Sequence, residues 1–285
     1  MSFVLTGFAD EISNDPDEQI ETLIQAKINY LELRGVNGQN ILEMNDDQAL
    51  DFKSKLDKAK LSVSSIGSPI GKVQIRSDLT NHMNHFRIAL QRAKMFRTPY
   101  VRVFSFYHEG INPDLCRGEI ITFFKQMVYE AHIAKCIILH ENERNIYGET
   151  PARCLDLMET LNSPRLRLAF DPANFVQAGI KPLIDAWPNL KHHTEYFHIK
   201  DALAKNGRIV PAGHGDGDLA KILQQATANN FNGFLSIEPH LKADDPDYGG
   251  SGPERFLTAV RALRSLLEQI GSIESFEKPP LKDHE

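Results

Sequence analysis

The sequence predicts an α/β fold, a (β/α)8 barrel, from three observations. Eight short β-rich runs alternate with longer amphipathic stretches along almost the whole chain. Each run and its following stretch take roughly 30 to 40 residues, the length that a parallel crossover needs. The first run is followed by ADEI, without the GxGxxG turn that is typical of an open, doubly wound sheet. A closed barrel is therefore favoured, and 285 residues suit one such unit.

The predicted elements follow one another in the order that a barrel requires. Asp15, Asn45 and Thr150 stand at the expected starts of three helices, because short polar side chains cap helix N-termini. The last helix is expected over residues 254–270. The predicted strands are residues 3–9, 30–34, 61–68, 100–106, 136–141, 166–171, 195–200 and 234–238.

The composition is that of one ordinary globular domain, which we expect over residues 1–270. The remaining residues, 271–285, are rich in Ser, Pro, Lys and Glu and have little to bury, so a flexible tail is expected there. Cys116, Cys136 and Cys154 form no CxxC pair, and reduced structural cysteines are the prediction.

The charge pattern argues against large charged partners. The formal net charge is −6, and basic residues are scattered over the helical stretches, so we expect no nucleic-acid binding. No apolar run approaches the roughly 18 residues that span a bilayer, and the N-terminal apolar stretch lacks the features of a signal peptide. We expect a cytoplasmic protein without a membrane partner, and the sequence leaves a homo-oligomer open.

Four metal-binding residue types stand at the ends of the last four predicted strands. Glu141, Asp171, His198 and Glu238 are 30, 27 and 40 residues apart, which is one strand–helix unit each time. In barrels of this kind the loops after the strands converge on one mouth, where the chemistry takes place. The four side chains are therefore expected to meet.

The alternation of side chains along these strands supports that expectation. In LSIEPH, Leu235 and Ile237 face one way, and Ser236, Glu238 and His240 face the other. The strands LAFDP and YFHIK divide in the same manner, with the larger apolar residues opposite the acid or the histidine. The predicted ligands thus fall on the less apolar, inward face.

A cluster of three carboxylates and one imidazole indicates a site for one divalent metal ion. Without a cation the carboxylates would repel one another and be driven toward protonation. Oxygen and nitrogen ligands without thiolate suit Mn, Mg, Co or Zn, and the residue types alone do not choose among them. The alternative is that each acid is a polar strand cap with no common role.

Five motifs in this order resemble one known family, the xylose-isomerase-like TIM barrels. They are LHENE (139–143), FDPANF (170–175), FHIKDA (197–202), VPAGHGDGD (210–218) and LSIEPH (235–240). The resemblance covers about residues 3–270 and implies a TIM barrel among sugar isomerases, sugar epimerases and endonuclease IV relatives. It also implies that Glu141, Asp171, His198 and Glu238 are metal ligands, and that the two glutamates act as acid and base.

The sequence departs from the family pattern at two positions. Sugar epimerases often carry DxxH where this chain has Asn174 after Asp171, and a further glutamate where Tyr147 stands here. Endonuclease IV-type members need a trinuclear zinc cluster with histidines from the third, fourth and sixth strands. Because too few histidines are available at these strand ends, a nuclease is not expected.

Four further residues are predicted to bind substrate. The resemblance places Arg208 where ketose epimerases have a substrate-binding arginine, although an exposed loop charge is the alternative. Lys200 shares the inward parity of His198 and suits a hydroxyl, carboxylate or phosphate, or else a pairing with a neighbouring acid. Arg34 points inward with Glu32, either in an internal ion pair or toward substrate, and Asn174 completes the set.

The glycine-rich segment 213–217 has two interpretations. Its backbone amides suit a phosphate, but such segments are usually tight turns.

Together these patterns predict a metal-dependent isomerase or epimerase of a small sugar-like substrate, working by proton transfer through an enediolate. The alternatives are a non-catalytic metal- or sugar-binding barrel and a metal-dependent dehydratase or hydrolase on the same scaffold.

Overall fold

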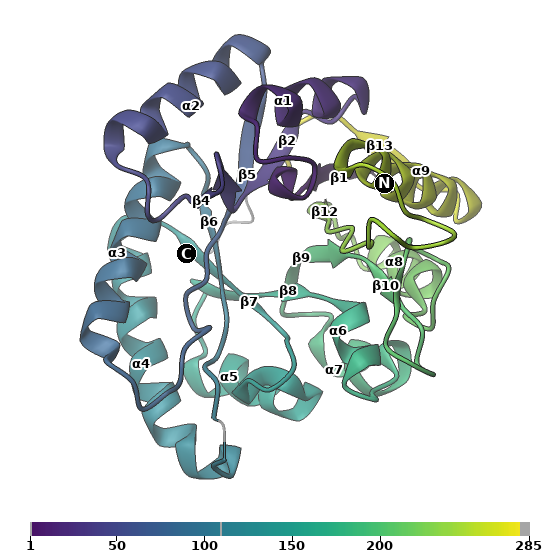
Figure 1. The fold of residues 1–285 in the computed structure, drawn as a ribbon. Helices are drawn as coiled ribbons and strands as arrows, with labels where there is room; N and C mark the ends of the chain where they lie inside the picture. Colours follow the sequence, from purple (N-terminus) through teal and green to yellow (C-terminus); the bar gives the residue numbers. More distant parts are fainter. Residues whose placement is uncertain (1, 109, 280–285) are drawn as a thin grey trace.

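A computed structural model describes residues 2–108 and 110–279, and within them the chain forms a closed barrel (Figure 1). From β2 to β12 each barrel strand pairs in parallel with the next one in the ring, and β12 pairs back with β1 through Val4 and Phe234. A parallel bridge between Phe8 and Glu32 closes the ring between β1 and β2. The barrel strands are β1 (Ser2–Gly7), β2 (Tyr30–Leu33), β5 (Ser62–Gly67), β6 (Tyr100–Val103), β7 (Ile137–Glu141), β8 (Leu166–Phe170), β9 (Thr194–Ile199) and β12 (Phe234–Ile237).

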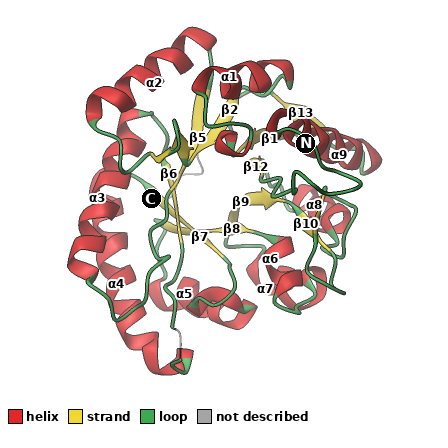
Figure 2. Cartoon of the chain, in the orientation of Figure 1, coloured by secondary structure: helices red, strands yellow, loops and turns green. Residues whose placement is uncertain are grey.

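The helices lie outside the ring of strands (Figure 2). The side chains of Asp15, Asn45 and Thr150 accept hydrogen bonds at the starts of α1, α2 and α5, which confirms the three predicted helix starts. The helices are α1 (Pro16–Gln25), α2 (Asp46–Ala59), α3 (Leu79–Met95), α4 (Pro113–Ala134), α5 (Pro151–Leu161), α6 (Pro172–Gln177), α7 (Trp187–Leu190), α8 (Leu219–Ala228) and α9 (Gly252–Gln269). Short helical turns are η1 (Ala9–Glu11), η2 (Tyr147–Glu149) and η3 (Pro182–Ala186).

The predicted (β/α)8 fold is confirmed, and each predicted strand is present. The largest difference is at β6, which ends at Val103 instead of at residue 106. Two hairpins in the loops were not predicted: β3 (Gly35–Val36) with β4 (Gln39–Asn40), and β10 (Asp201–Ala202) with β11 (Ile209–Val210). Hairpins of two-residue strands are too short to leave a periodic pattern in a sequence.

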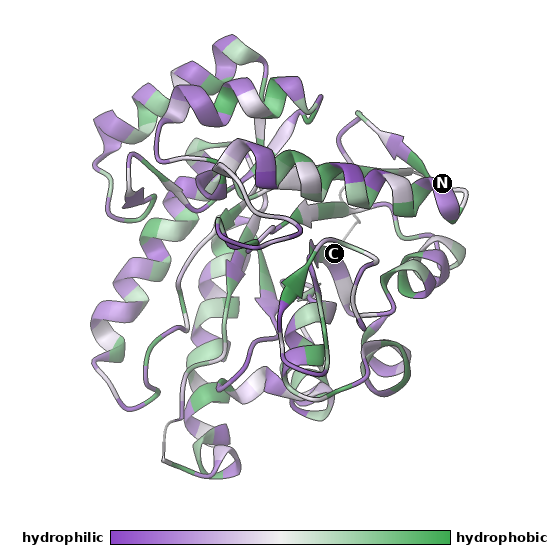
Figure 3. Ribbon diagram, turned by 45° about the vertical axis from the view of Figure 1, so that its right-hand side comes forward, coloured by the Kyte–Doolittle hydropathy of each residue, from purple (hydrophilic) through white to green (hydrophobic). Residues whose placement is uncertain are grey.

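Side chains of the strands divide between two cores, as their alternation predicts. The larger core lies between the sheet and the helices, whose polar and apolar residues alternate as in amphipathic helices (Figure 3). The smaller core fills the inside of the barrel and consists of Val4, Tyr100, Ile137, Leu139, Ala169, Tyr196 and Phe234. The predicted ligands lie on the inner face, nearer the carboxyl ends of the strands.

Beyond α9 the chain returns to the barrel. Strand β13 (Ile273–Ser275) pairs in parallel with Ser2–Val4 of β1. The predicted flexible tail, 271–285, therefore contains a paired strand, and its residues 280–285 lie outside the described part. None of the helices described is long and apolar enough to cross a membrane.

Candidate metal centre

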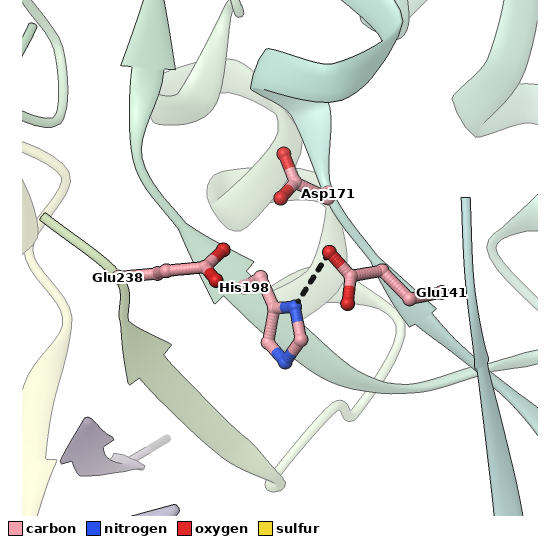
Figure 4. A group of neighbouring side chains, drawn as sticks. All are labelled: Glu141, Asp171, His198 and Glu238. Carbon is pink, nitrogen blue, oxygen red and sulfur yellow. Dashed lines mark ion pairs between the residues drawn. The ribbon is translucent and has the colours of Figure 1, made fainter. Parts of the chain in front are cut away.

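Four side chains from neighbouring strands meet at the carboxyl end of the barrel (Figure 4). Glu141 is the last residue of β7, Asp171 follows β8, His198 lies in β9, and Glu238 follows β12. One atom from each lies within 4.8 Å of the others, and all four residues are buried. The structure thus brings together the full set of predicted ligands.

His198 is held between two carboxylates. Its Nδ1 lies 3.1 Å from Oε1 of Glu141, and its Nε2 lies 3.1 Å from Oε2 of Glu32. Ser236 donates a 2.7 Å hydrogen bond to the same oxygen of Glu32. Glu32 therefore pairs with His198 and not with Arg34, which corrects the internal ion pair considered from the sequence. Both glutamate and arginine point inward, but the barrel twist separates their side chains.

Asp171 and Asn174 form the start of α6. The backbone N–H of Asn174 donates to Oδ1 of Asp171 at 2.9 Å, an N-cap interaction that fixes the carboxylate. The side-chain amide of Asn174 donates to Oε1 of Glu141 at 3.1 Å and to the carbonyl of Asn142 at 2.9 Å. Asn174 therefore contacts the ligand set and orients Glu141.

Lys200 places its ammonium group among the acids. Its Nζ lies 2.8 Å from Oδ2 of Asp171 and 2.5 Å from Oε2 of Glu238. The side chain is only 3% exposed. Of the two roles considered from the sequence, the pairing of an inward lysine with neighbouring acids is the one observed. Its contact with two of the four predicted ligands also places it inside the candidate site.

Burial and mutual charge shift the pKa values of these groups in different directions. Burial, reinforced by the charges of Glu141 and Glu238, raises the pKa of Asp171 to about 6 despite the nearby Lys200. Burial also disfavours ionised Glu141, but His198 and Arg102 outweigh it and lower the pKa of Glu141 to about 2. Glu141 is therefore ionised at neutral pH, whereas Asp171 is the more easily protonated of the two.

The donor atoms fit a divalent ion. Within the described chain, Oε2 of Glu141, Oδ2 of Asp171 and Nδ1 of His198 are buried without a hydrogen bond of good geometry. Three carboxylates and one imidazole are the oxygen and nitrogen donors that divalent ions such as Mg²⁺ and Zn²⁺ take in proteins. Glu32 supplies the outer-shell carboxylate that metal-binding histidines usually have. A metal is thus compatible with the residues present.

A cavity of about 150 Å³ is lined by two of the predicted ligands, Glu141 and Glu238, and by Arg34. The guanidinium of Arg34 contacts Asp10 at 2.7 Å, Glu11 at 3.1 Å and Glu238 at 3.2 Å. His240 lies 3.3 Å from Oε1 of the same Glu238. The predicted inward position of Arg34 is therefore observed, next to a ligand and at the cavity.

Among the described residues, Arg208 makes no contact with the four predicted ligands. It makes a two-pronged ion pair with Asp245, at 3.0 and 2.7 Å, and a further one with Asp247 at 2.7 Å. Its guanidinium also lies 5.6 Å from the ring centre of Tyr248. A role in binding substrate remains a prediction for this residue.

The glycine-rich segment is a set of tight turns around Asp201. The backbone N–H groups of Gly213, Gly215 and Gly217 all donate to the Asp201 carboxylate, at 2.9 to 3.1 Å. A Cβ on Gly215 would lie 2.4 Å from that carboxylate, which explains the glycine. The amides that a phosphate would need are already bonded, so the tight-turn interpretation is correct.

Three basic residues that line the cavity were not predicted to belong to the site: Lys72, Arg102 and His240. Arg102 alternates with Val101 and Val103 in β6, so the parity rule that selected Arg34 would also have found it. His240 shares the parity of Glu238. Lys72 lies in a loop after β5, where no periodic signal exists.

Comparisons with known proteins agree with the fold. Residues 20–266 match the family described as xylose isomerase-like TIM barrel. No curated protein matches the sequence significantly.

Three similar solved structures share the fold at low sequence identity. The IOLI protein with a bound zinc atom is 15% identical, with a TM-score of 0.77, covering 94% of this chain and 99% of that one. The probable 3-DHS dehydratase AsbF from Bacillus anthracis is 16% identical, with a TM-score of 0.72, covering 93% and 99%. The 3-keto-D-glucoside 4-epimerase YcjR from E. coli is 14% identical, with a TM-score of 0.69, covering 94% and 99%.

Proposed function

Because this chain belongs to the xylose isomerase-like TIM barrel family, we propose that it is a divalent-metal-dependent isomerase or epimerase of a small sugar or sugar-like ketose. The observation that carries the proposal is the convergence of Glu141, Asp171, His198 and Glu238 within 4.8 Å in a buried site. A similar structure contains zinc and another is a sugar epimerase, which supports the same reading. Mn, Mg, Co and Zn all suit these ligands.

The two glutamates are the proposed acid and base. Figure 4 shows Glu141 and Glu238 reaching toward each other from opposite sides, with Asp171 and His198 between them. The charges around them, despite burial, lower the pKa of each carboxyl group, so both are ionised in the metal-free protein, which is the form that the proton-accepting member of the pair needs. A bound divalent ion would polarise the substrate carbonyl and stabilise the enediolate that proton removal produces.

The placement of the glutamates determines the stereochemical outcome. If one carboxylate removes the proton next to the carbonyl and the other, after it has taken up a proton from solvent, gives that proton to the opposite face, the product is an epimer. If the proton returns to the neighbouring carbon, the product is an isomer. Lys200, Arg34 and Asn174 are close enough to these carboxylates to bind substrate hydroxyl groups, and the same role is proposed for Arg208.

Solvent deuterium exchange tests the proposal directly. The metal-loaded protein is incubated in D2O with ketoses, aldoses and their acid and phosphate derivatives, and the substrates are followed by NMR. We expect deuterium at the carbon next to the carbonyl of one substrate. Glu141→Gln and Glu238→Gln should each slow that exchange by about 10²- to 10⁴-fold. If both variants keep their metal and exchange at the wild-type rate, the assignment of acid and base is wrong.

Glu195→Gln is a matched control for these variants. Glu195 is a buried carboxylate that accepts a 2.7 Å hydrogen bond from Tyr100, at the other end of its strand from the ligands. Its loss should leave exchange unchanged in the folded protein.

The same spectra identify the alternative reactions. Proton removal followed by loss of a hydroxyl group would make the protein a dehydratase, and one similar structure is described as a probable dehydratase. A new vinyl proton signal would show this. Absence of exchange with every compound, in protein that binds metal, would favour a non-catalytic binding barrel.

A further inference from the structure

Two basic side chains that the proposed chemistry does not use line one wall of the cavity. They are Arg102, from β6, and Lys72, from the loop after β5. Both lie against Phe104: the guanidinium carbon of Arg102 is 4.5 Å from the ring centre, and Nζ of Lys72 is 4.2 Å from it. Phe104 therefore contacts both cations, and Arg102 also contacts the predicted ligand Glu141.

Arg102 has few partners for a buried arginine. Its side chain is 4% exposed, and its one ion pair, to Oε2 of Glu141, is 3.3 Å long. Its Nε is buried without a hydrogen-bond partner among the described residues. A buried donor that is left unbonded costs about 1 to 3 kcal/mol, so its retention needs a reason.

Arg92 shows what a structural arginine looks like in the same protein. Its side chain is 5% exposed, which is close to that of Arg102. Its guanidinium donates to the carbonyls of Ile41 and Met44 and to the carboxylate of Asp46, at 3.2, 2.6 and 2.6 Å. The difference between Arg92 and Arg102 indicates that the guanidinium of Arg102 binds a group that is not part of the chain.

Lys72 is held in position by the loop that carries it. Gly71 has a φ of +88°, and a Cβ there would lie 2.0 Å from the carbonyl oxygen of Phe104. The backbone N–H of Phe104 donates to Ile70, and that of Phe106 donates to Gly71, at 2.7 and 3.0 Å. The backbone of the loop that carries Lys72 is thus fastened to the end of β6, next to Arg102.

We propose that the substrate of this site carries a carboxylate group, which Arg102 and Lys72 bind. The inference rests on the proposed function, because it places the substrate between these cations and the metal ligands. A planar guanidinium fork matches a carboxylate and forms two parallel hydrogen bonds with it. The substrate class is therefore a sugar acid: a polyhydroxy acid that also carries the reacting carbonyl.

The charges around the cavity favour a carboxylate over a phosphate. Glu141, Glu143 and Glu238 also line the cavity, and Glu143 lies 3.4 Å from Lys72. Arg34, the other arginine in the wall, already contacts three carboxylates. A phosphate dianion would add two negative charges beside these three carboxylates, whereas a carboxylate group adds only one.

Small molecules that share the same three-carbon skeleton test the inference, although the substrate itself is not identified. D-Glycerate, L-glycerate, glycerol and glycerol 1-phosphate are titrated into the full-length protein at constant ionic strength, with metal and again after chelation, and binding is measured by calorimetry. At least one glycerate should bind tenfold or more tightly than glycerol. Arg102→Met should remove that preference, a loss of about tenfold or more in affinity for glycerate.

Further variants keep the test decisive. Arg102→Lys retains the charge but not the fork and should bind glycerate more weakly than the wild type; Lys72→Met should also weaken it. Arg76→Met removes one exposed positive charge outside the cavity, where Arg76 pairs with Glu119, and should change nothing. If Arg102→Met does not fold, Arg102→Lys and Lys72→Met decide the result.

Three outcomes would overturn the inference. They are equal binding of glycerate and glycerol, wild-type glycerate binding in all three cavity variants, and Arg102-dependent binding of glycerol phosphate that exceeds that of glycerate. The titrations after chelation test the carboxylate site separately from the proposed metal-dependent function. The protein could bind glycerate through Arg102 and yet take up no metal or show no deuterium exchange. That result would support the carboxylate site and contradict the proposed isomerase or epimerase activity.

Discussion

Nε2 of His198 lies 3.1 Å from Oε2 of Glu32, on the side of the imidazole ring that faces away from Glu141. Both residues are fully buried, so no water competes for this contact. If Nε2 keeps its hydrogen and donates it to Glu32, Nδ1 is the nitrogen that would bind a metal ion. Glu32, on β2, thereby sets which nitrogen of His198 is available to a metal.

We predict that Glu32→Gln weakens metal binding by about 10- to 100-fold, the usual effect of losing an outer-shell partner. Glutamine retains the shape but not the charge that stabilises the bound imidazole. Titration with Mn²⁺, followed by electron paramagnetic resonance, measures the change. Glu195→Gln removes another buried carboxylate and should keep wild-type affinity; equal affinity of Glu32→Gln and wild type would contradict the outer-shell role.

Metal content should follow the four ligands. We expect one divalent ion per chain in protein purified without chelator, and clearly less in Glu238→Gln and His198→Ala, because each removes a donor from a four-residue set. Elemental analysis of the three proteins measures this. The same metal content in all of them would refute the assignment.

Lys200→Met should make the chelated protein markedly less stable. The ammonium group lies within 2.8 Å of Asp171 and also contacts Glu238, and removal of one partner from a buried ion pair costs about 3 to 5 kcal/mol. A divalent ion would restore most of that loss, because it supplies positive charge to the same carboxylates. Urea unfolding with and without chelator tests both statements.

Lys55→Met is the matched control, since Lys55 pairs with Asp17 at the protein surface. It should change the free energy of unfolding little under either condition. A Lys200 variant as stable as the wild type after chelation would show that the acids do not need the ammonium group.

His82 should make the protein less stable in mild acid. Burial, with a small contribution from His85, lowers the pKa of His82 to about 4, and its Nε2 accepts a 2.7 Å hydrogen bond from the backbone of Gly71. As the pH falls, the unfolded chain binds a proton near 6.5, but the folded protein binds it only near 4. The free energy of unfolding therefore falls between these pH values, by about 3 kcal/mol from this residue.

His82→Gln isolates that contribution, because glutamine accepts the same hydrogen bond without titrating. Urea unfolding from pH 7.5 to pH 4 should show a shallower decline for the variant than for the wild type. The pKa of His140 is also lowered to about 4 by burial, but this residue is present in both proteins and cancels in the comparison. Parallel curves would show that His82 does not cause the acid sensitivity.

The fold could be predicted because strand and helix patterns repeat along the sequence. The ligands could be predicted because apolar and polar side chains alternate along each strand. Asp171 and Glu238 could be found because each follows a strand whose outward residues are plainly apolar. The partner of Glu32 could not be found in this way. Parity says that a side chain points inward, but the partner depends on the twist that brings β2 opposite β9, which local sequence does not encode. Lys72 depends on a loop that is positioned by long-range contacts.

The pairing of β1 with β12 also sets a time scale. Leu5 and its partner Leu235 are 230 residues apart, and a ribosome adds about 5 to 20 residues per second, so Leu5 waits roughly 10 to 50 seconds for its neighbour. During that interval one edge of β1, with its apolar outward face, has no strand beside it from β12 or β13. Exposed strand edges recruit other chains. The ring topology thus leaves this strand edge open to other chains until synthesis is nearly complete.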